Sequence, residues 1–83
     1  MRALTRAECQ SLGEWMVEAC RTKPNERSER IEGWCSEIIR GVGDGTWVSR
    51  DCMKNIKYMD SVCIRSASNV HAMRDCDSAV HRP

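Results

Sequence analysis

The sequence predicts an all-α fold, a small disulfide-stapled bundle of about four helices that forms one domain over residues 1–83. Apolar residues recur at intervals of three and four, the spacing of one helix face, and no segment alternates apolar and polar residues as a half-buried strand does. The chain has 83 residues, the length of one small domain. Six of them are cysteines, an even number that allows three disulfides.

The first predicted helix spans about residues 5–20. Thr5 and Glu8 have the spacing of a capping box, in which the side chain of each residue bonds the backbone amide of the other. The polar segment 21–25 ends the helix. Its apolar face has spacings of three, four and four residues and consists of Cys9, Leu12, Met16 and Cys20.

The second predicted helix spans about residues 28–40. Its apolar face has the i, i+3, i+4, i+7, i+8 spacing that an amphipathic helix presents to a core. We expect Gly41 to end this helix and residues 42–45 to form a flexible connection. The face consists of Ile31, Trp34, Cys35, Ile38 and Ile39.

The third and fourth predicted helices span about residues 49–65 and 69–80. Ser49 is expected to cap the third helix, and residues 66–69 form the turn before the fourth. The apolar face of the third helix consists of Cys52, Ile56, Met59 and Cys63, widened by Met53 and Val62. The apolar face of the fourth consists of Val70, Met73, Cys76 and Val80.

All six cysteines are predicted to form disulfides: Cys9, Cys20, Cys35, Cys52, Cys63 and Cys76. A domain of this size buries a modest core, and small folds of this kind commonly add disulfides for stability. The alternatives are six buried free thiols or a metal site. Zinc ligands come in close pairs, whereas at least 10 residues separate any two of these cysteines, so we expect no metal and no other cofactor.

The cysteine spacing limits the disulfide pairing. Cys9 and Cys20 lie on one face of the first predicted helix about 16 Å apart, which exceeds the roughly 4.4–6.8 Å between the Cα atoms of a disulfide. Cys52 and Cys63 repeat this spacing on the third helix. In an up-down-up-down bundle these two helices run parallel, which favours the pairs 9–52, 20–63 and 35–76. An exchange of partners at one end, to give 9–76 and 35–52, also fits.

Disulfides predict an oxidising compartment, so we expect a secreted or periplasmic protein. Residues 1–4 lead into a polar segment and include no apolar core of a signal peptide. We therefore expect the signal peptide to lie outside this chain, which would then be a mature region with Met1 added for expression.

Two resemblances rest on these cysteines. The repeated pair is similar to the twin cysteine pairs of the coiled-coil-helix-coiled-coil-helix proteins of the mitochondrial intermembrane space. Here a helix and Cys35 lie between the two pairs, so no function is carried over, and the close cysteine pairs of a saposin are absent. Four segments, which cover under a third of the chain, resemble small secreted cysteine-rich helical proteins of bacteria with no assigned activity, a resemblance that implies export and helices: Asp51-Cys52-Met53, Asp60-Ser61-Val62-Cys63, Ser66-Ala67-Ser68 and Met73-Arg74-Asp75-Cys76.

Composition and motifs argue against several functions. The formal net charge of +1 lacks the surplus of Lys and Arg that a nucleic-acid binder needs, and no apolar stretch approaches the roughly 20 residues that cross a bilayer. His71 and His81 lie outside any catalytic motif, and residues 41–45 lack the preceding strand and the Gly-Lys-Ser/Thr of a phosphate loop. We therefore predict no enzymatic activity, no catalytic residue and no membrane insertion.

The remaining hypothesis is binding to a protein partner, as an inhibitor, immunity protein or adaptor, by a monomer or small oligomer. One alternative is a structural or chaperone-like subunit of an envelope complex. The other is a thiol redox carrier, which needs a reactive cysteine near positive charge, such as Cys52 beside Arg50 or Lys54.

Trp47 and Trp15 are the candidate contact residues for that partner. Trp47 lies in the predicted connection after the second helix, where it is either a plug over the core or an exposed anchor. Trp15 adjoins the core face of the first helix and lies either in the core or at its edge. Trp34 is expected in the core, as are four methionines that would adapt their shape to the space available: Met16, Met53, Met59 and Met73.

Overall fold

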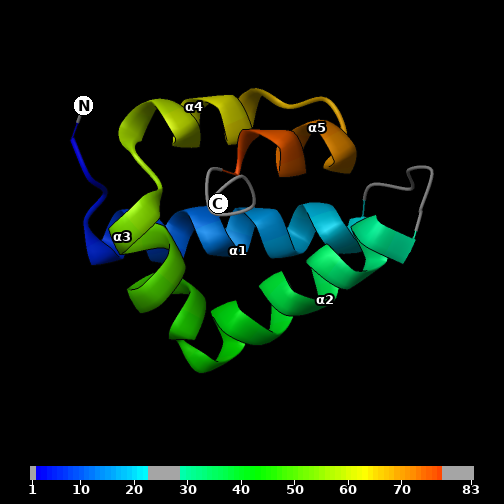
Figure 1. The fold of residues 1–83 in the computed structure, drawn as a ribbon, viewed down its shortest axis with the longest axis horizontal. Coiled ribbons are helices and arrows are strands. Elements are labelled where there is room, and N and C mark those ends of the chain that lie inside the picture. The colour runs from blue at the N-terminus through cyan, green and yellow to red at the C-terminus, as the bar shows by residue number, and fades with distance from the viewer. Residues whose placement is uncertain (1, 23–28, 78–83) are drawn as a thin grey trace.

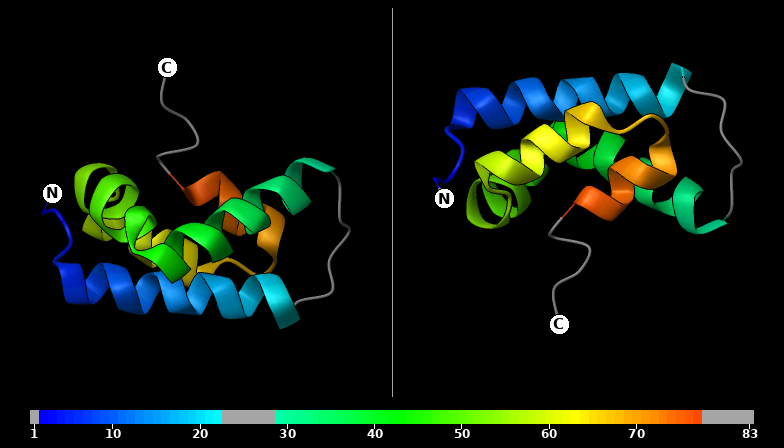
Figure 2. Two further views of the ribbon diagram at one scale, coloured as in Figure 1. Left: turned by 90° about the horizontal axis from the view of Figure 1, so that it is seen from below. Right: turned by 90° about the horizontal axis from the view of Figure 1, so that it is seen from above.

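The computed structural model describes residues 2–22 and 29–77, which are almost entirely helical. The elements are α1 (Arg6–Thr22), α2 (Glu29–Asp44), the π-helical turn η1 (Trp47–Cys52), the single turn α3 (Met53–Asn55), α4 (Tyr58–Ser66) and α5 (Val70–Cys76). Helix α1 packs against α2, η1 and α4, and α5 completes the core by packing against α4 and α2 (Figures 1 and 2). The prediction of an all-α, disulfide-rich fold is confirmed, since the described residues contain no strand.

Helix α1 begins as its sequence predicts. The Glu8 amide donates to Thr5 Oγ1 at 3.1 Å, and the Thr5 amide donates to Glu8 Oε1 at 2.9 Å, so both halves of the capping box are present. The predicted apolar face is the buried face, with Gly13 and Ala19 added to it. Helix α1 therefore turns one continuous apolar side toward the core.

Helix α2 continues past the glycine that was expected to end it. Gly41 is buried inside the helix, where a Cβ atom would lie only 2.8 Å from Cβ of Trp47. Glycine at position 41 allows Trp47 to pack closely against α2, and it does not end the helix. The chain leaves α2 after Asp44 at Gly45, whose φ of 84° lies in the left-handed region that glycine adopts readily.

The predicted third helix is interrupted: η1 and α3 form one helical stretch, and α4 follows after a break. Helical structure begins at Trp47, so Ser49 lies inside η1 and is not a cap. The backbone is extended at Ile56 and Lys57, and the helical path resumes at Tyr58. The N-terminal segment holds this break: Ala3 forms an antiparallel bridge with Lys57, and the Tyr58 amide donates to the Arg2 carbonyl oxygen at 3.0 Å.

Helix α5 is shorter than the fourth predicted helix. It begins at an Asn69 cap, whose Oδ1 accepts a hydrogen bond from the Ala72 amide at 2.7 Å, and it ends at Cys76. Val70 and Met73 are buried as predicted. The predicted extension over residues 78–80 lies outside the described residues.

Three disulfides join neighbouring elements. Cys9–Cys52 links α1 to η1, Cys20–Cys35 links α1 to α2, and Cys63–Cys76 links α4 to α5. The predicted pair 9–52 is therefore confirmed, whereas 20–63, 35–76 and the alternatives 9–76 and 35–52 are wrong. These pairings assumed an unbroken third helix parallel to the first, and the break at residues 56–57 removes that arrangement.

Candidate interaction surface

The two predicted contact tryptophans have different environments. Trp47 is only 3% exposed, because its ring packs between α1 and α2 against Gly13 and Gly41. It is the plug over the core, and its prediction as a contact residue for a partner is corrected by this burial. Trp15 is half-buried at the edge of the core, where the Arg65 guanidinium lies 6.0 Å from the centre of its ring.

An exposed apolar face of α4 is the clearest candidate surface. Three large apolar side chains lie on this face: Tyr58 is 45% exposed, Met59 56% and Val62 41%. The buried positions of α4 are instead Ser61 and Ile64. We call Tyr58, Met59 and Val62 the α4 face. Sequence reasoning assigned Met59 and Val62 to the core and did not consider Tyr58, so the predicted core side of this segment is its outer side.

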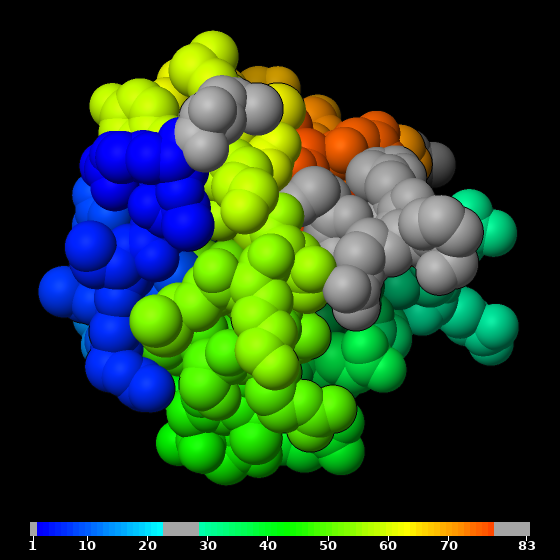
Figure 3. Space-filling model, turned by 60° about the vertical axis from the view of Figure 1, so that its left-hand side comes forward, coloured from blue at the N-terminus to red at the C-terminus, as the bar shows by residue number. Residues whose placement is uncertain are grey.

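A groove of about 380 Å³ adjoins the α4 face. It runs between α1 and α4, and Figure 3 shows the N-terminal segment (blue) beside the start of α4 (yellow) at this surface. Its walls are mostly apolar, with a carboxylate and a guanidinium among them. The lining residues are Leu4, Ala7, Glu8, Ser11, Leu12, Tyr58, Ser61, Val62 and Arg65.

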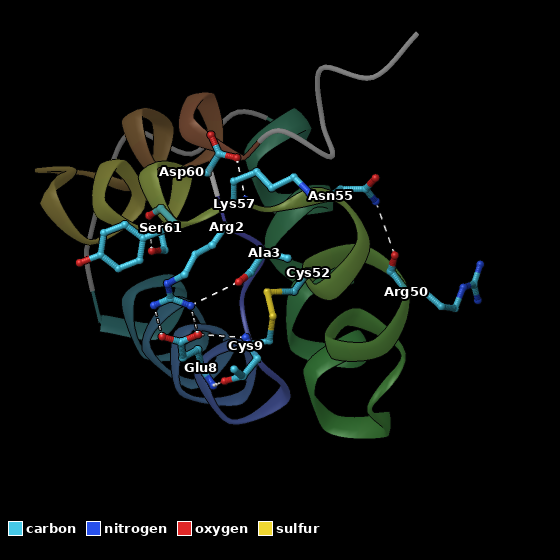
Figure 4. Close-up of a disulfide and its surroundings, with 12 residues drawn as sticks. Arg2, Ala3, Glu8, Cys9, Arg50, Cys52, Asn55, Lys57, Asp60 and Ser61 are labelled. Atoms are coloured by element: carbon cyan, nitrogen blue, oxygen red, sulfur yellow. Dashed lines mark hydrogen bonds and ion pairs between the residues drawn. A yellow bond between two sulfur atoms is a disulfide. The ribbon is translucent and has the colours of Figure 1, made fainter.

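An ion pair fixes the end of the groove at the N-terminal segment. The two terminal guanidinium nitrogens of Arg2 donate to the Glu8 carboxylate, at 2.7 and 2.6 Å, and the guanidinium carbon lies 4.9 Å from the centre of the Tyr58 ring. Figure 4 shows Arg2 and Glu8 beside the Cys9–Cys52 disulfide. The hydrogen bonds from Arg2 and from the Thr5 amide lower the pKa of Glu8 to about 2. Glu8 is thus a structural carboxylate that already has its partners.

Arg65 supplies the cationic group of the groove. One of its guanidinium nitrogens donates to Ser11 Oγ at 3.1 Å, and the group also lies over Trp15. Within residues 2–22 and 29–77 no carboxylate forms an ion pair with Arg65. The groove therefore combines apolar walls with a positively charged group that can still form an ion pair with a carboxylate.

Outside the groove, one histidine of α5 lies near a carboxylate on the same helix. His71 Nδ1 lies 3.4 Å from an Asp75 oxygen, and both side chains are mostly exposed. The described residues hold no cluster of His, Cys, Asp and Glu that would bind a metal, and every cysteine is in a disulfide. None of the described helices has the length and apolarity needed to cross a bilayer.

Comparison of the chain with protein-family models, with curated proteins and with solved structures finds no match.

Proposed function

We propose that this protein is a binding domain of an oxidising compartment, secreted or periplasmic, that acts on a protein partner as an inhibitor, immunity protein or adaptor. The observation that carries the proposal is the α4 face. Most of the large apolar side chains of the described residues are buried in the core. Three of them are nevertheless exposed together on one helix. Exposed apolar side chains grouped in this way are typical of contact surfaces.

The chemistry of the groove suggests the chemistry of the partner. An apolar segment with an acidic residue would place its aliphatic side chains against Val62 and Ala7 and its carboxylate against Arg65. A hydrogen bond from Arg65 to that carboxylate would join two charged groups. It would therefore be stronger than the bond that Arg65 now donates to the Ser11 hydroxyl. Tyr58 and Arg65 are of the residue types that most often dominate binding energy.

The assignment to an oxidising compartment rests on the cysteines. Three disulfides and no free cysteine are typical of proteins that fold outside the reducing cytosol. The resemblance of residues 51–76 to small secreted bacterial proteins supports the same assignment.

Site-specific photo-crosslinking in the native host tests the surface. A photoreactive amino acid at Val62 should give a crosslinked adduct with a partner. The same amino acid at Ser36, an exposed position on α2, should not. Equal adducts at both positions, or none at Val62, would overturn the assignment of the α4 face.

Affinity measurements with the crosslinked partner test its chemistry. We expect Met59→Asp to weaken binding about 30-fold, the effect of losing a contact worth about 2 kcal/mol at the centre of an interface. Arg65→Glu should also weaken binding. Arg30→Glu is its control, because it makes the same charge reversal at an exposed position of α2. Equal losses from the two reversals would show a general charge effect and not a specific one.

A further inference from the structure

The three disulfides differ sharply in their exposure to solvent. Cys9 and Cys52 are both 0% exposed, and Cys20 and Cys35 are both 4% exposed. Cys63 is an exposed residue and Cys76 is half-buried. Within this fold a thiol in solution can therefore approach the bond between α4 and α5, while the other two bonds are covered by the core. Because attack on a disulfide needs access to one of its sulfurs, this difference becomes a difference in reaction rate.

The α4–α5 pair does not depend on this bond for its packing. Ile64 on α4 and Val70 on α5 are both 0% exposed, and Met73 is 1% exposed, so the inner sides of the two helices are held by the core. The cap from Asn69 fixes the start of α5 independently. The disulfide also closes the shortest loop of the three, with a separation of 13 residues, so its loss releases the least chain entropy.

We propose that Cys63–Cys76 is a thiol–disulfide exchange site that a dithiol reduces, and that the oxidised form of the same reagent re-forms by the reverse exchange, while the rest of the fold stays intact. The proposal goes beyond the binding function and does not depend on it. One thiolate of the dithiol attacks Sγ of Cys63, the S–S bond breaks, and Cys76 leaves as a thiolate that takes up a proton. The second thiol of the reagent, as its thiolate, then attacks the reagent's own sulfur in the mixed disulfide, and Cys63 leaves as a thiolate that takes up a proton. The products are the oxidised reagent and two protein thiols, so one disulfide is reduced and one is formed.

The position of Cys63 favours a protein as the source of the dithiol. Cys63 follows Met59 by one helical turn, so the exposed sulfur-bearing residue borders the α4 face. Small-molecule dithiols share the same chemistry and need no such surface. The two sources are separated by the reagents used in the test.

Differential alkylation of the native, folded chain is the decisive experiment. Limiting dithiothreitol is added, free thiols are blocked at successive times, and the blocked cysteines are identified by peptide mass mapping. We expect Cys63 and Cys76 to become free at least about tenfold faster than the other four cysteines, because access controls the rate. The far-ultraviolet circular dichroism should stay constant during this first phase. Opening of all three bonds at one rate, earlier opening of another bond, or loss of helix with the first bond would each overturn the proposal.

A trapping reagent identifies the source. A reduced oxidoreductase with a Cys-x-x-Cys motif whose resolving cysteine is replaced by serine should form a mixed disulfide on Cys63. Adduct at Cys63 assigns the site to protein dithiols, whereas reduction by dithiothreitol without an adduct assigns it to small thiols. The variant Cys63→Ser/Cys76→Ser is the folding control. It should retain the helical spectrum of the parent and give no early alkylation phase, and its failure to fold would also overturn the proposal.

Discussion

Trp47 depends on two glycines whose missing side chains make room for it. A Cβ atom on Gly41 would lie 2.8 Å from Trp47 Cβ, and one on Gly13 would lie 3.0 Å from ring atom Cζ3 of Trp47. Distances this short require atoms to move. The two glycines therefore determine how closely α1 and α2 can approach η1, and a bulky ring fills the junction of three elements.

Gly41→Ala should destabilise the fold by about 1–3 kcal/mol, the usual cost of overpacking, because Trp47 Cβ is attached to the backbone and cannot rotate away. Gly33→Ala is the matched control in the same helix. Nothing lies within 4 Å of the added methyl group there, and helix propensity should stabilise the variant by up to about 1 kcal/mol. Urea unfolding measures both. Equal stabilities of the two variants would contradict the packing of Trp47 on Gly41.

Asp77 is a buried carboxyl group at the end of α5. It is 2% exposed, and its Oδ2 accepts a hydrogen bond of 3.2 Å from the Trp34 indole N–H. Asp77→Ala should cost about 1–3 kcal/mol, because a buried donor loses this acceptor. Asp77→Asn keeps an acceptor oxygen and should lose less. Thermal unfolding compares the two, and identical losses would show that the bond to Trp34 is not the cause.

Glu8 should make the stability of the fold depend on acid pH. Its pKa is lowered from 4.5 to about 2 by the hydrogen bonds from Arg2 and Thr5. Because the folded state holds the proton less tightly than the unfolded state, the stabilisation is complete above about pH 4.5 and is lost as the pH falls toward 2. Glu8→Gln should therefore flatten the decline of the urea midpoint across this range. A decline as steep as that of the parent would rule Glu8 out as its source.

At the scale of the elements, α4 shows how a two-residue break changes which side of a helix is buried. Cys52, Ile56, Met59 and Cys63 have the spacing of one continuous face, yet the first two are buried and the last two are exposed. The extended residues Ile56 and Lys57 separate the two halves and restart the helical phase at Tyr58. A pattern of apolar spacing is informative only as long as the helix is unbroken.

Alanine substitution of two residues of that pattern should give opposite results. Ile56 is 0% exposed, so Ile56→Ala should cost about 2–5 kcal/mol, as do comparable truncations in cores. Met59 is 56% exposed, so Met59→Ala should change stability by less than about 0.5 kcal/mol. Urea unfolding of both variants distinguishes this structure from a single helix over 49–65, in which both losses would be large.

Local signals explain how much of the fold could be predicted. The capping box of α1 and the apolar faces of α1 and α2 involve residues within one or two helical turns, and these predictions are confirmed. The break before α4 depends on pairing between Ala3 and Lys57, and the role of Gly41 depends on Trp47. Such contacts leave no local pattern. For the same reason the sequence alone does not show that Trp47 is buried or that the exposed apolar side chains lie on α4.

At the scale of the whole molecule, the disulfides should differ in how much they stabilise the fold. Cys9–Cys52 has a sequence separation of 43 and Cys63–Cys76 one of 13, a difference worth about 1 kcal/mol in loop entropy. Removing the buried pair also disturbs the core. The variant Cys9→Ala/Cys52→Ala should therefore unfold at a lower temperature than Cys63→Ala/Cys76→Ala. Calorimetry checks the order, and the reverse order would contradict this account.

The order of the cysteines along the chain has a consequence for biosynthesis. The pairs do not cross: 20–35 lies inside 9–52, and 63–76 follows both. A chain that emerges N-terminus first exposes Cys9 and Cys20 together, before any correct partner of either is available. Once α1 is helical it holds these two sulfurs about 16 Å apart and prevents their pairing. Early formation of α1 would thus exclude the wrong pair 9–20 during the period when these are the only two cysteines that have emerged.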